Sequence, residues 1–558
     1  MFPILWHNEE RIRNAMEKEG RCMKFLLPEP ADLAKRAKAA VPRACAAAFL
    51  SALIVGLVTH LYLFTNKLPN HDDILGLFTA NDMLMSGRWF LAVPSAVSSK
   101  ISVPWVNGLL SLVLLAATAA LTVRILSIKR PFLAALCGAL LVTFPVVGHT
   151  LIYMFTADAY CFALLCAVLG LALARRYRYG FLAGGVLLGL SLACYQVYIF
   201  FAVALIAADL LTSLSAGTDD ARTLVFRILR YVGALALGAI VYVVGLRILL
   251  SVRHMALTDY MGISSMGSSL LGSPAALLSG VQKAYETYFD VFRGRAYILN
   301  TTTQRTVFLL MNLLSIGMPL YALVRRREKR ALYWVLTALL LLAFPLAVNA
   351  VYVINSEIVH SLMLYAYVVP MLLPLALYDA ISPVCPDGVP VRRRQRSLMF
   401  LYLLCAVTVF SAVNYASRTN QTYLVLQLKF DNMLSLANRI VDRVEQMPEY
   451  TPDTPVWFQG TVQEGNYAPE KDGAFVRASD TPATAFESEY GFFMNNLYFS
   501  NFTKHYVGVT FVEPERAKVE AILKTDAFLS MPYYPYAGSV KYIDGIIFVR
   551  IGPGGTVL

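Results

Sequence analysis

The sequence predicts a polytopic α-helical membrane protein that ends in a small α/β domain outside the membrane. Of its 558 residues, 57% are hydrophobic and 15% are charged, whereas a soluble domain carries about 25% charged residues. Apolar runs of roughly 18 residues recur between positions 44 and 416, and each could cross about 30 Å of hydrocarbon as a helix. Lipid offers no partner to a bare backbone amide, so these runs must be helical. After residue 416 the composition becomes polar.

The charge distribution favours a membrane role over nucleic-acid binding. The net charge is +12, but residues 1–416 carry +16 and residues 417–558 carry −4. The basic residues form short clusters beside the apolar runs, as orientation in a membrane requires. All eight cysteines precede residue 417 and none forms a CxxC motif, so a zinc ribbon or redox motif is not indicated.

About eleven transmembrane or partly embedded helices are expected. We split the run from 181 to 211 at Cys194-Tyr195-Gln196-Val197, because the connections on one side of the membrane then carry 27 Lys and Arg residues against eight on the other, as the positive-inside rule favours. The two resulting helices have about 14 residues and a reach of about 21 Å, so we expect them to dip in and return. The expected helices cover 44–64, 104–123, 132–150, 159–174, 181–194, 197–211, 231–250, 306–324, 331–352, 361–378 and 398–416.

Three domains follow from these helices. They are a cytoplasmic N-terminal segment (1–43), a transmembrane domain (44–416) with outer loops 65–103 and 251–305, and an extracytoplasmic α/β domain (417–558). In the first loop, the 3–4 spacing of apolar residues from Ile74 to Trp89 predicts an interfacial amphipathic helix. The C-terminal domain is expected to contain helices over 421–447 and 514–523, a strand over 456–460 and a hairpin over 541–550 that turns at Asp544-Gly545.

Two polar motifs in the first outer loop are candidates for chemistry. His71-Asp72-Asp73 follows the first span directly, and Gly87-Arg88-Trp89 comes fifteen residues later. Adjacent carboxylates at a membrane surface are costly unless they have a partner or a task; the alternative is that they cap the following helix. Walker, GxGxxG, HExxH and GxSxG motifs are absent, so ATP-driven transport, dinucleotide chemistry and serine hydrolysis lack their signatures.

These residues resemble those of a known family. The chain resembles the Gtr-type O-antigen glucosyltransferases of bacteria, which belong to the GT-C class of polytopic glycosyltransferases. The resemblance is carried by their order and topology: His71-Asp72-Asp73, Gly87-Arg88-Trp89-Phe90, the outer turn with Asp158, the Tyr195-Gln196 break, and Gly538–Gly545 after Met531-Pro532-Tyr533-Tyr534-Pro535.

The resemblance implies a glycosyltransferase of the cell membrane that uses a polyprenyl-phosphate sugar, with glucosyl as the implied group. Transfer would go to a surface glycan on the extracytoplasmic face, with eleven helical elements enclosing the lipid-linked sugar under the C-terminal domain. The family's acidic base in the first outer loop maps to Asp72 or Asp73, of which we prefer Asp73. Such a base takes the proton of the attacking hydroxyl, and attack opposite the leaving group inverts the anomeric carbon.

Several other residues are candidates for substrate binding. Arg88 can hold the donor phosphate in a bidentate fork or contact lipid headgroups. Trp89 can stack on a sugar or belong to the interfacial aromatic belt. Tyr195 and Gln196 lie at a helix break near membrane depth, where they would line a cavity or pack between the two helices.

Three further candidates lie at outer helix ends. Asp158 would hold the acceptor, share a divalent cation with Asp72 and Asp73, or cap its helix. His360 would bind the phosphate or be a structural histidine, and Glu357 lies in the same turn. No ligand cluster has metal-site spacing, so we predict no certain cofactor.

Two other functions fit the same composition. A flippase or polymerase of lipid-linked saccharides would share the substrate and the compartment, but would carry polar groups through several span centres. A non-catalytic membrane scaffold would present the C-terminal domain as a binding module, and its function would survive neutral replacements of Asp72 and Asp73.

Overall fold

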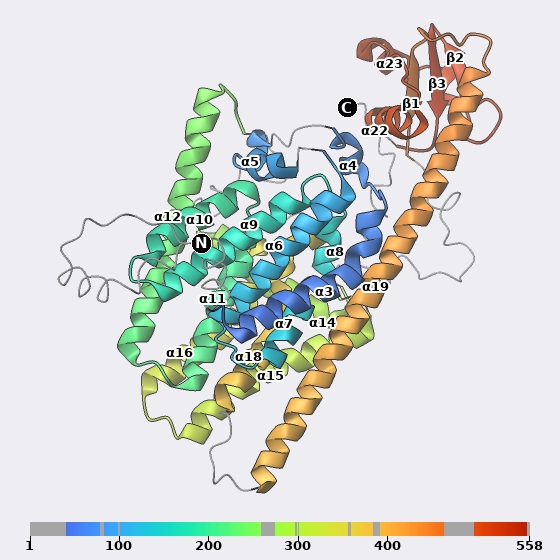
Figure 1. Cartoon of the computed structure of the whole chain (residues 1–558). Helices are drawn as coiled ribbons and strands as arrows, with labels where there is room; N and C mark the ends of the chain where they lie inside the picture. Colours follow the sequence, from blue (N-terminus) through green and yellow to red (C-terminus); the bar gives the residue numbers. More distant parts are fainter. Residues whose placement is uncertain are drawn as a thin grey trace, which may run out of the picture.

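The protein is a helical bundle joined by one long helix to a small C-terminal domain (Figure 1). The computed structural model describes residue 39 and residues 41–78, 83–98, 101–257, 274–295, 298–299, 301–354, 359–382, 391–461 and 496–554.

The bundle contains the following helices. They are α3 (Arg43–Thr65), α6 (Pro104–Ile125), α7 (Pro131–Thr143), α8 (Pro145–Leu151), α9 (Ala157–Arg176), α10 (Gly180–Cys194), α11 (Tyr198–Ala216), α12 (Ala221–Val252), α14 (Pro274–Arg293), α15 (Thr302–Arg326), α16 (Ala331–Val348), α17 (Val351–Ile354) and α18 (Val369–Ile381), with 3₁₀ turns η3 (Ser361–Met363) and η4 (Tyr365–Val368). The long helix α19 (Val391–Glu445) runs along the bundle.

Each of the eleven expected apolar runs contains a helix. Among the described residues, eight helices are long and apolar enough to cross a membrane, or nine if α7 and α8, bent by 47°, form one span. α10 and the segment Tyr365–Ile381 are shorter apolar helices. The protein is therefore a polytopic helical membrane protein by length and composition, and the number of crossings stays a prediction.

The split of the 181–211 run is present, but its two helices are unequal. Tyr195 has an extended backbone that ends α10, and α11 starts three residues later. α11 continues to Ala216 and has 19 residues, about 28 Å at 1.5 Å per residue. The prediction of two 14-residue helices is wrong for α11, because its apolar face continues into the core beyond Leu211.

The amphipathic helix predicted from Ile74 to Trp89 is also wrong. α4 (His71–Leu75) ends at Gly76, and a 3₁₀ turn, η1 (Leu84–Ser86), leads into a left-handed Gly87. A β-bridge between Met83 and Arg88 closes this turn, and the short helices α5 (Ala92–Ser95) and η2 (Ala96–Ser98) follow. The apolar spacing instead reflects burial of separate side chains such as Ile74, Leu84 and Leu91.

The loop 251–305 contains an amphipathic helix, α14 (Pro274–Arg293). This helix buries Gly280, Ala284, Tyr288 and Val291 against its neighbours and exposes Leu278. Tyr288 stacks on Tyr367 with 5.5 Å between ring centroids. The Gly- and Ser-rich run 262–269 of this loop lies outside the described residues.

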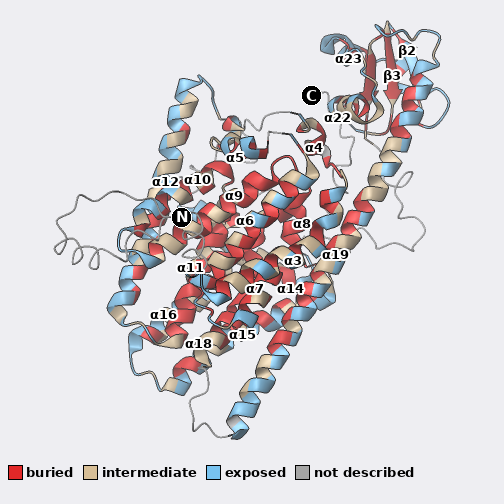
Figure 2. Cartoon of the chain, in the orientation of Figure 1, coloured by how far each residue is buried: buried red, intermediate tan, exposed pale blue. Residues whose placement is uncertain are grey.

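Glycines allow the closest helix contacts in the bundle. A Cβ at Gly138 of α7 would lie 2.3 Å from the Ala48 carbonyl oxygen of α3. Gly170 of α9 and Gly184 of α10 face each other in the same way, with Cβ-to-carbonyl distances of 2.7 and 2.5 Å. Small residues permit such backbone contact in membrane bundles, and Figure 2 shows the buried interior that results.

One continuous helix replaces the expected span 398–416 and the separate helix 421–447. α19 has 55 residues, about 80 Å at 1.5 Å per residue. Figure 1 shows it running from one end of the bundle to the C-terminal domain. Inside that domain it contributes Leu436, Ile440 and Val444 to the core.

The C-terminal domain contains the strand, helix and hairpin that were predicted. The strands β1 (Val456–Gln459), β2 (Val540–Ile543) and β3 (Ile546–Arg550) form a sheet in the order β1-β3-β2, with β1 parallel and β2 antiparallel to β3. The hairpin turns at Asp544 and Gly545, both at positive φ, as a tight hairpin requires. The helices α22 (Asn496–Phe502), α23 (Arg516–Ile522) and α24 (Asp526–Leu529) and the π-helical turn η7 (Thr503–Val507) complete the domain.

Described residues of three basic clusters bind the ends of bundle helices. Arg175 donates to Asp209 (3.0 Å) and to Ser127 (2.8 Å), which links the ends of α9, α11 and α6. Arg326 donates to the carbonyl of Leu214 at 2.7 Å. Arg130 donates to the Ser382 carbonyl at 2.6 Å. These contacts agree with the side assignment used to split the 181–211 run.

Candidate functional site

The described candidate residues lie on elements that meet at the bundle end facing the C-terminal domain (Figure 1). α4, the segment 83–98, the turn between α8 and α9 and the break between α10 and α11 meet there. Figure 1 shows α4 and α5 above the bundle, with α4 next to α22.

Asp73 is fully buried and its carboxylate is held by three groups. Oδ2 forms an ion pair with Lys67. Oδ1 accepts hydrogen bonds from the Ser102 hydroxyl at 2.6 Å and from the backbone N–H of Phe155 at 2.9 Å. Asp73 thereby ties α4 to the end of α3 and to the turn between α8 and α9.

Asp72 occupies the first turn of the same helix and is half-buried. The N-cap of this helix is Asn70, whose side chain accepts from the Asp73 N–H at 2.8 Å. Neither aspartate is therefore the capping residue, although both lie where the helix dipole favours negative charge. Tyr160 lies within electrostatic range of both Asp72 and Arg88, so the three side chains share one neighbourhood.

Arg88 lies against two stacked tyrosines. Its Nη1 donates to the Tyr160 hydroxyl at 2.9 Å. Its guanidinium carbon lies 4.9 Å from the ring centroid of Tyr195, and the Tyr160 and Tyr195 rings are stacked at 4.2 Å. Desolvated cation–π contacts of this kind hold an arginine in place and leave its donors directed.

Trp89 and Gln196 both contact α12. The Trp89 indole donates to the Tyr242 carbonyl at 3.2 Å, and its ring lies against Gly245, where a Cβ would be 2.5 Å away. The Gln196 amide donates to the Tyr242 hydroxyl at 3.2 Å and to the Ser86 carbonyl at 3.3 Å. These two residues attach the Arg88 segment to the bundle.

Asp158 is buried at the start of α9. The residue is 2% exposed, and neither carboxylate oxygen has a hydrogen-bond partner within the described part of the chain. The N-cap of α9 is Thr156, so of the alternatives for Asp158, that of the capping residue is wrong. Across the described ranges, no three His, Cys, Asp or Glu side chains gather as metal ligands.

His360 is half-buried and precedes Ser361, the first residue of η3. Ser361 is hydrogen-bonded to Nδ1 of the buried His149 in α8. Glu357 lies outside the described residues.

Comparison with protein families decides the identity. The model of the family described as "Glucosyl transferase GtrII" matches residues 61–375. The chain belongs to the GtrII glucosyl transferase family. No curated protein and no solved structure matches it.

The GtrII match covers every candidate residue and ends inside α18. It leaves all of α19 and the C-terminal domain outside. The glucosyl transferase family and the long apolar helices together support a membrane glucosyltransferase, which needs a sugar donor and a glycan acceptor.

Sequence reasoning missed the residues that hold the candidates in place. Five residues from different parts of the fold contact the candidates or their neighbours. They are Lys67 and Ser102 (to Asp73), Tyr160 (to Arg88), Tyr242 (to Gln196) and His149 (to Ser361). Only Lys67 gave a usable signal, because a lone lysine six residues before an acidic pair can bridge to it. The other contacts depend on how distant helices pack.

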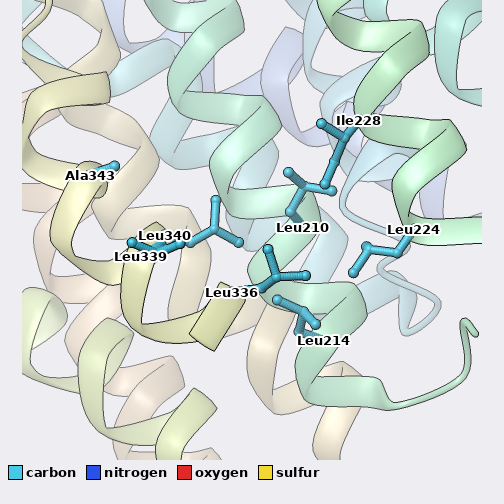
Figure 3. A pocket seen from close by; sticks show the side chains of 8 residues that line it. All are labelled: Leu210, Leu214, Leu224, Ile228, Leu336, Leu339, Leu340 and Ala343. Atoms are coloured by element: carbon cyan, nitrogen blue, oxygen red, sulfur yellow. The ribbon is translucent and has the colours of Figure 1, made fainter. Parts of the chain in front are cut away.

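An apolar cavity lies elsewhere, between α11, α12 and α16 (Figure 3). Its volume is about 190 Å³, and Leu210, Leu214, Leu224, Ile228, Leu336, Leu339, Leu340 and Ala343 line it. None of the candidate residues takes part in it.

Proposed function

We propose that this GtrII-family protein transfers a glucosyl group from a polyprenyl-phosphate donor to a surface glycan with inversion at the anomeric carbon. The observation that carries this proposal is that α4, which carries Asp72, and Arg88 lie at the same end of the bundle: Asp73 of α4 accepts from the Phe155 N–H in the turn before α9, and Arg88 donates to Tyr160 of α9. A carboxylate and a cation placed together supply the two things that glycosyl transfer needs. The carboxylate accepts the proton, and the cation stabilises the departing phosphate.

Asp72 is the proposed base. The acceptor oxygen attacks the anomeric carbon and its proton passes to the Asp72 carboxylate. The bond between that carbon and the phosphate oxygen breaks, and the lipid phosphate leaves with the electron pair. Asp73 fits this role less well because Lys67, Ser102 and the Phe155 N–H already hold its carboxylate; its proposed task is to fix α4.

Arg88 is the proposed phosphate ligand. The stacked pair of Tyr160 and Tyr195 supports its guanidinium, so little side-chain freedom remains to be lost when a phosphate binds. Trp89 and Gln196 keep this segment against α12, and in this proposal they position Arg88 instead of stacking on a sugar.

The remaining candidates are assigned to the acceptor side and to the phosphate. The buried Asp158 carboxylate would accept a hydrogen bond from an acceptor hydroxyl or share a divalent cation with Asp72. His360 would contact the phosphate together with Arg88, and Glu357 would lie in the same outer turn.

The proposed location is the cell membrane, with residues 1–43 cytoplasmic and residues 417–558 extracytoplasmic. The basic ends of α6, α9, α11 and α15 support this orientation. A membrane-impermeant maleimide should label Tyr536→Cys, at a 69% exposed position of the C-terminal domain, in intact cells. Labelling only after the membrane is opened would reverse the orientation.

The test is sugar transfer by the purified protein. A panel of polyprenyl-phosphate sugars would be incubated with extracted surface glycan and with wild type, Asp72→Asn, Asp73→Asn or Arg88→Lys. We expect transfer of glucose by wild type, a loss of about 10²–10⁴-fold in kcat for Asp72→Asn, and mainly a raised donor KM for Arg88→Lys. Absence of transfer by a well-folded wild type from every donor would refute the proposed function.

A further inference from the structure

The C-terminal domain packs directly on the helix that carries the two aspartates. Ile74 follows Asp73 and is fully buried in the core of that domain, in one cluster with Leu436 and Ile440 of α19 and Phe499 and Phe502 of α22. A second contact lies beside it, where the ring of Phe78 is 5.3 Å from that of His505.

α4 depends on such contacts for its orientation. It has five residues, far fewer than the 12–15 that an isolated helix needs to be even marginally stable in water. Among the described elements, α22 is the one that packs extensively on it. The direction of α4 is therefore set by the residues that bind its side chains.

Consecutive residues of a helix point about 100° apart, so Asp72, Asp73 and Ile74 face three directions. Asp73 is bound to Lys67, Ser102 and Phe155 in the bundle, while Ile74 is inserted in the C-terminal domain. Asp72 has a third direction, at the bundle end where Arg88 is hydrogen-bonded to Tyr160. With Asp73 and Ile74 anchored on two sides, the direction of Asp72 is fixed.

The domain is also joined to the bundle by α19. α19 passes α3 and α7 and continues unbroken into the domain core. Tyr506 of η7 packs on Phe430 of α19 at 5.2 Å. The pKa of Tyr506 is raised, first by burial and then by the negative charge of Asp73, which agrees with a closely docked domain. A single helix of this kind acts as a strut and not as a flexible hinge.

We propose that the C-terminal domain is part of the catalytic unit, and that Ile74 is the positioning residue through which the domain directs Asp72 toward the reacting sugar. This inference rests on the proposed function, because it takes Asp72 as the base. It assigns the domain a different role from a lid that opens and closes: the domain must stay docked for the reaction to proceed.

The first test separates positioning from general loss of stability. Ile74→Ala removes the anchor, and we expect kcat to fall by about 100-fold, as for a misplaced reacting group, with both KM values nearly unchanged. Ile74→Val should retain most of the activity. The control is Val519→Ala, which truncates an equally buried residue in the second core of the same domain, away from α4, and should leave kcat within about twofold of wild type while lowering the thermal midpoint.

The outcomes are distinct. Equal kcat losses in Ile74→Ala and Val519→Ala, or unchanged kcat in Ile74→Ala, would overturn the positioning role while wild-type transfer still supports the proposed function. No transfer by wild type would defeat the proposed function itself.

A second test does not depend on the stability of Ile74→Ala. Phe78→Cys and His505→Cys, joined by a short bis-maleimide whose spacer contains a reducible disulfide, would lock the domain onto α4. The locked protein should transfer sugar at nearly the rate of the unlocked double variant. An inactive locked protein that recovers when the linker is cleaved would show that the domain must move, and would contradict the proposal.

Discussion

At the residue scale, the carboxylate of Asp73 depends on Lys67 for its charge balance. The Asp73 side chain is fully buried and that of Lys67 is 23% exposed. Removing one partner of a fully buried pair costs roughly 3–5 kcal/mol, and the partial exposure of Lys67 reduces this to about 2 kcal/mol.

We therefore expect Lys67→Met to lower the thermal midpoint in detergent, and Lys67→Met/Asp73→Asn to recover part of the loss. Lys67→Arg, which keeps the charge, is the control. A Lys67→Met protein as stable as wild type would mean that the ion pair does not hold α4.

The candidate residues could be predicted because each belongs to a short local pattern. Asp72, Arg88 and Asp158 stand out as charges at the ends of apolar runs. Their partners could not be predicted in the same way, since Arg88 meets Tyr160 across 72 positions of sequence and Asp73 meets Phe155 across 82. Such contacts are set by helix packing and not by spacing.

At the scale of single helices, the contact between α9 and α10 depends on two glycines. A Cβ at Gly184 would lie 2.5 Å from the Gly170 carbonyl oxygen, and backbone atoms cannot give way as a flexible side chain can. We expect Gly184→Val to destabilise the protein by about 3 kcal/mol or more through overpacking, measured as thermal midpoint in detergent. Gly317→Ala, with open space around the added Cβ, should be neutral or slightly stabilising.

The stability of the turn between α15 and α16 is expected to depend on pH. Hydrogen bonds from Arg330, two of them at 2.7 Å, lower the pKa of Glu328 from 4.5 to about 2. Because the folded pKa is below the unfolded value, the stabilisation is present above pH 4.5 and is lost as the pH falls through about 2.

The Trp334 indole donates to the Glu328 backbone carbonyl at 3.1 Å. The fluorescence of Trp334, obtained as the difference between wild type and Trp334→Phe, therefore reports on this turn. We expect its acid transition near pH 2. A transition near pH 4.5 would show that Arg330 does not bind the carboxylate.

The helices follow from the apolar runs because length and hydropathy dictate them in lipid. The continuity of α19 could not be predicted from length and hydropathy. Its apolar run ends near residue 416, but the backbone hydrogen bonds continue whether lipid, bundle or water surrounds them. The helix predicted over 74–89 does not form for a different reason. The apolar residues of this segment pack on two different parts of the molecule, the C-terminal domain and the bundle.

At the scale of the whole molecule, α19 fixes the distance between the bundle and the C-terminal domain. Tyr423 contacts His60 of the bundle at 2.8 Å, and Leu436 is already in the domain core. Asp431 lies between them and is exposed.

We expect Asp431→Pro to kink the helix, at a cost of about 3 kcal/mol, and to reduce transfer at least tenfold by displacing the domain. Asp431→Ala removes the same carboxylate without a kink and should keep full activity. Equal activity in the two variants would argue against a rigid strut.

The central claim is that Asp72 is the base of a glycosyl transfer. Its most direct test is a single-turnover measurement with the lipid-linked donor already bound, in wild type, Asp72→Asn and Asp73→Asn. We predict that Asp72→Asn binds the donor as wild type does but transfers the sugar at least 100-fold more slowly. For Asp73→Asn we predict mainly a lower thermal midpoint. Transfer by Asp72→Asn at the wild-type rate would contradict the account.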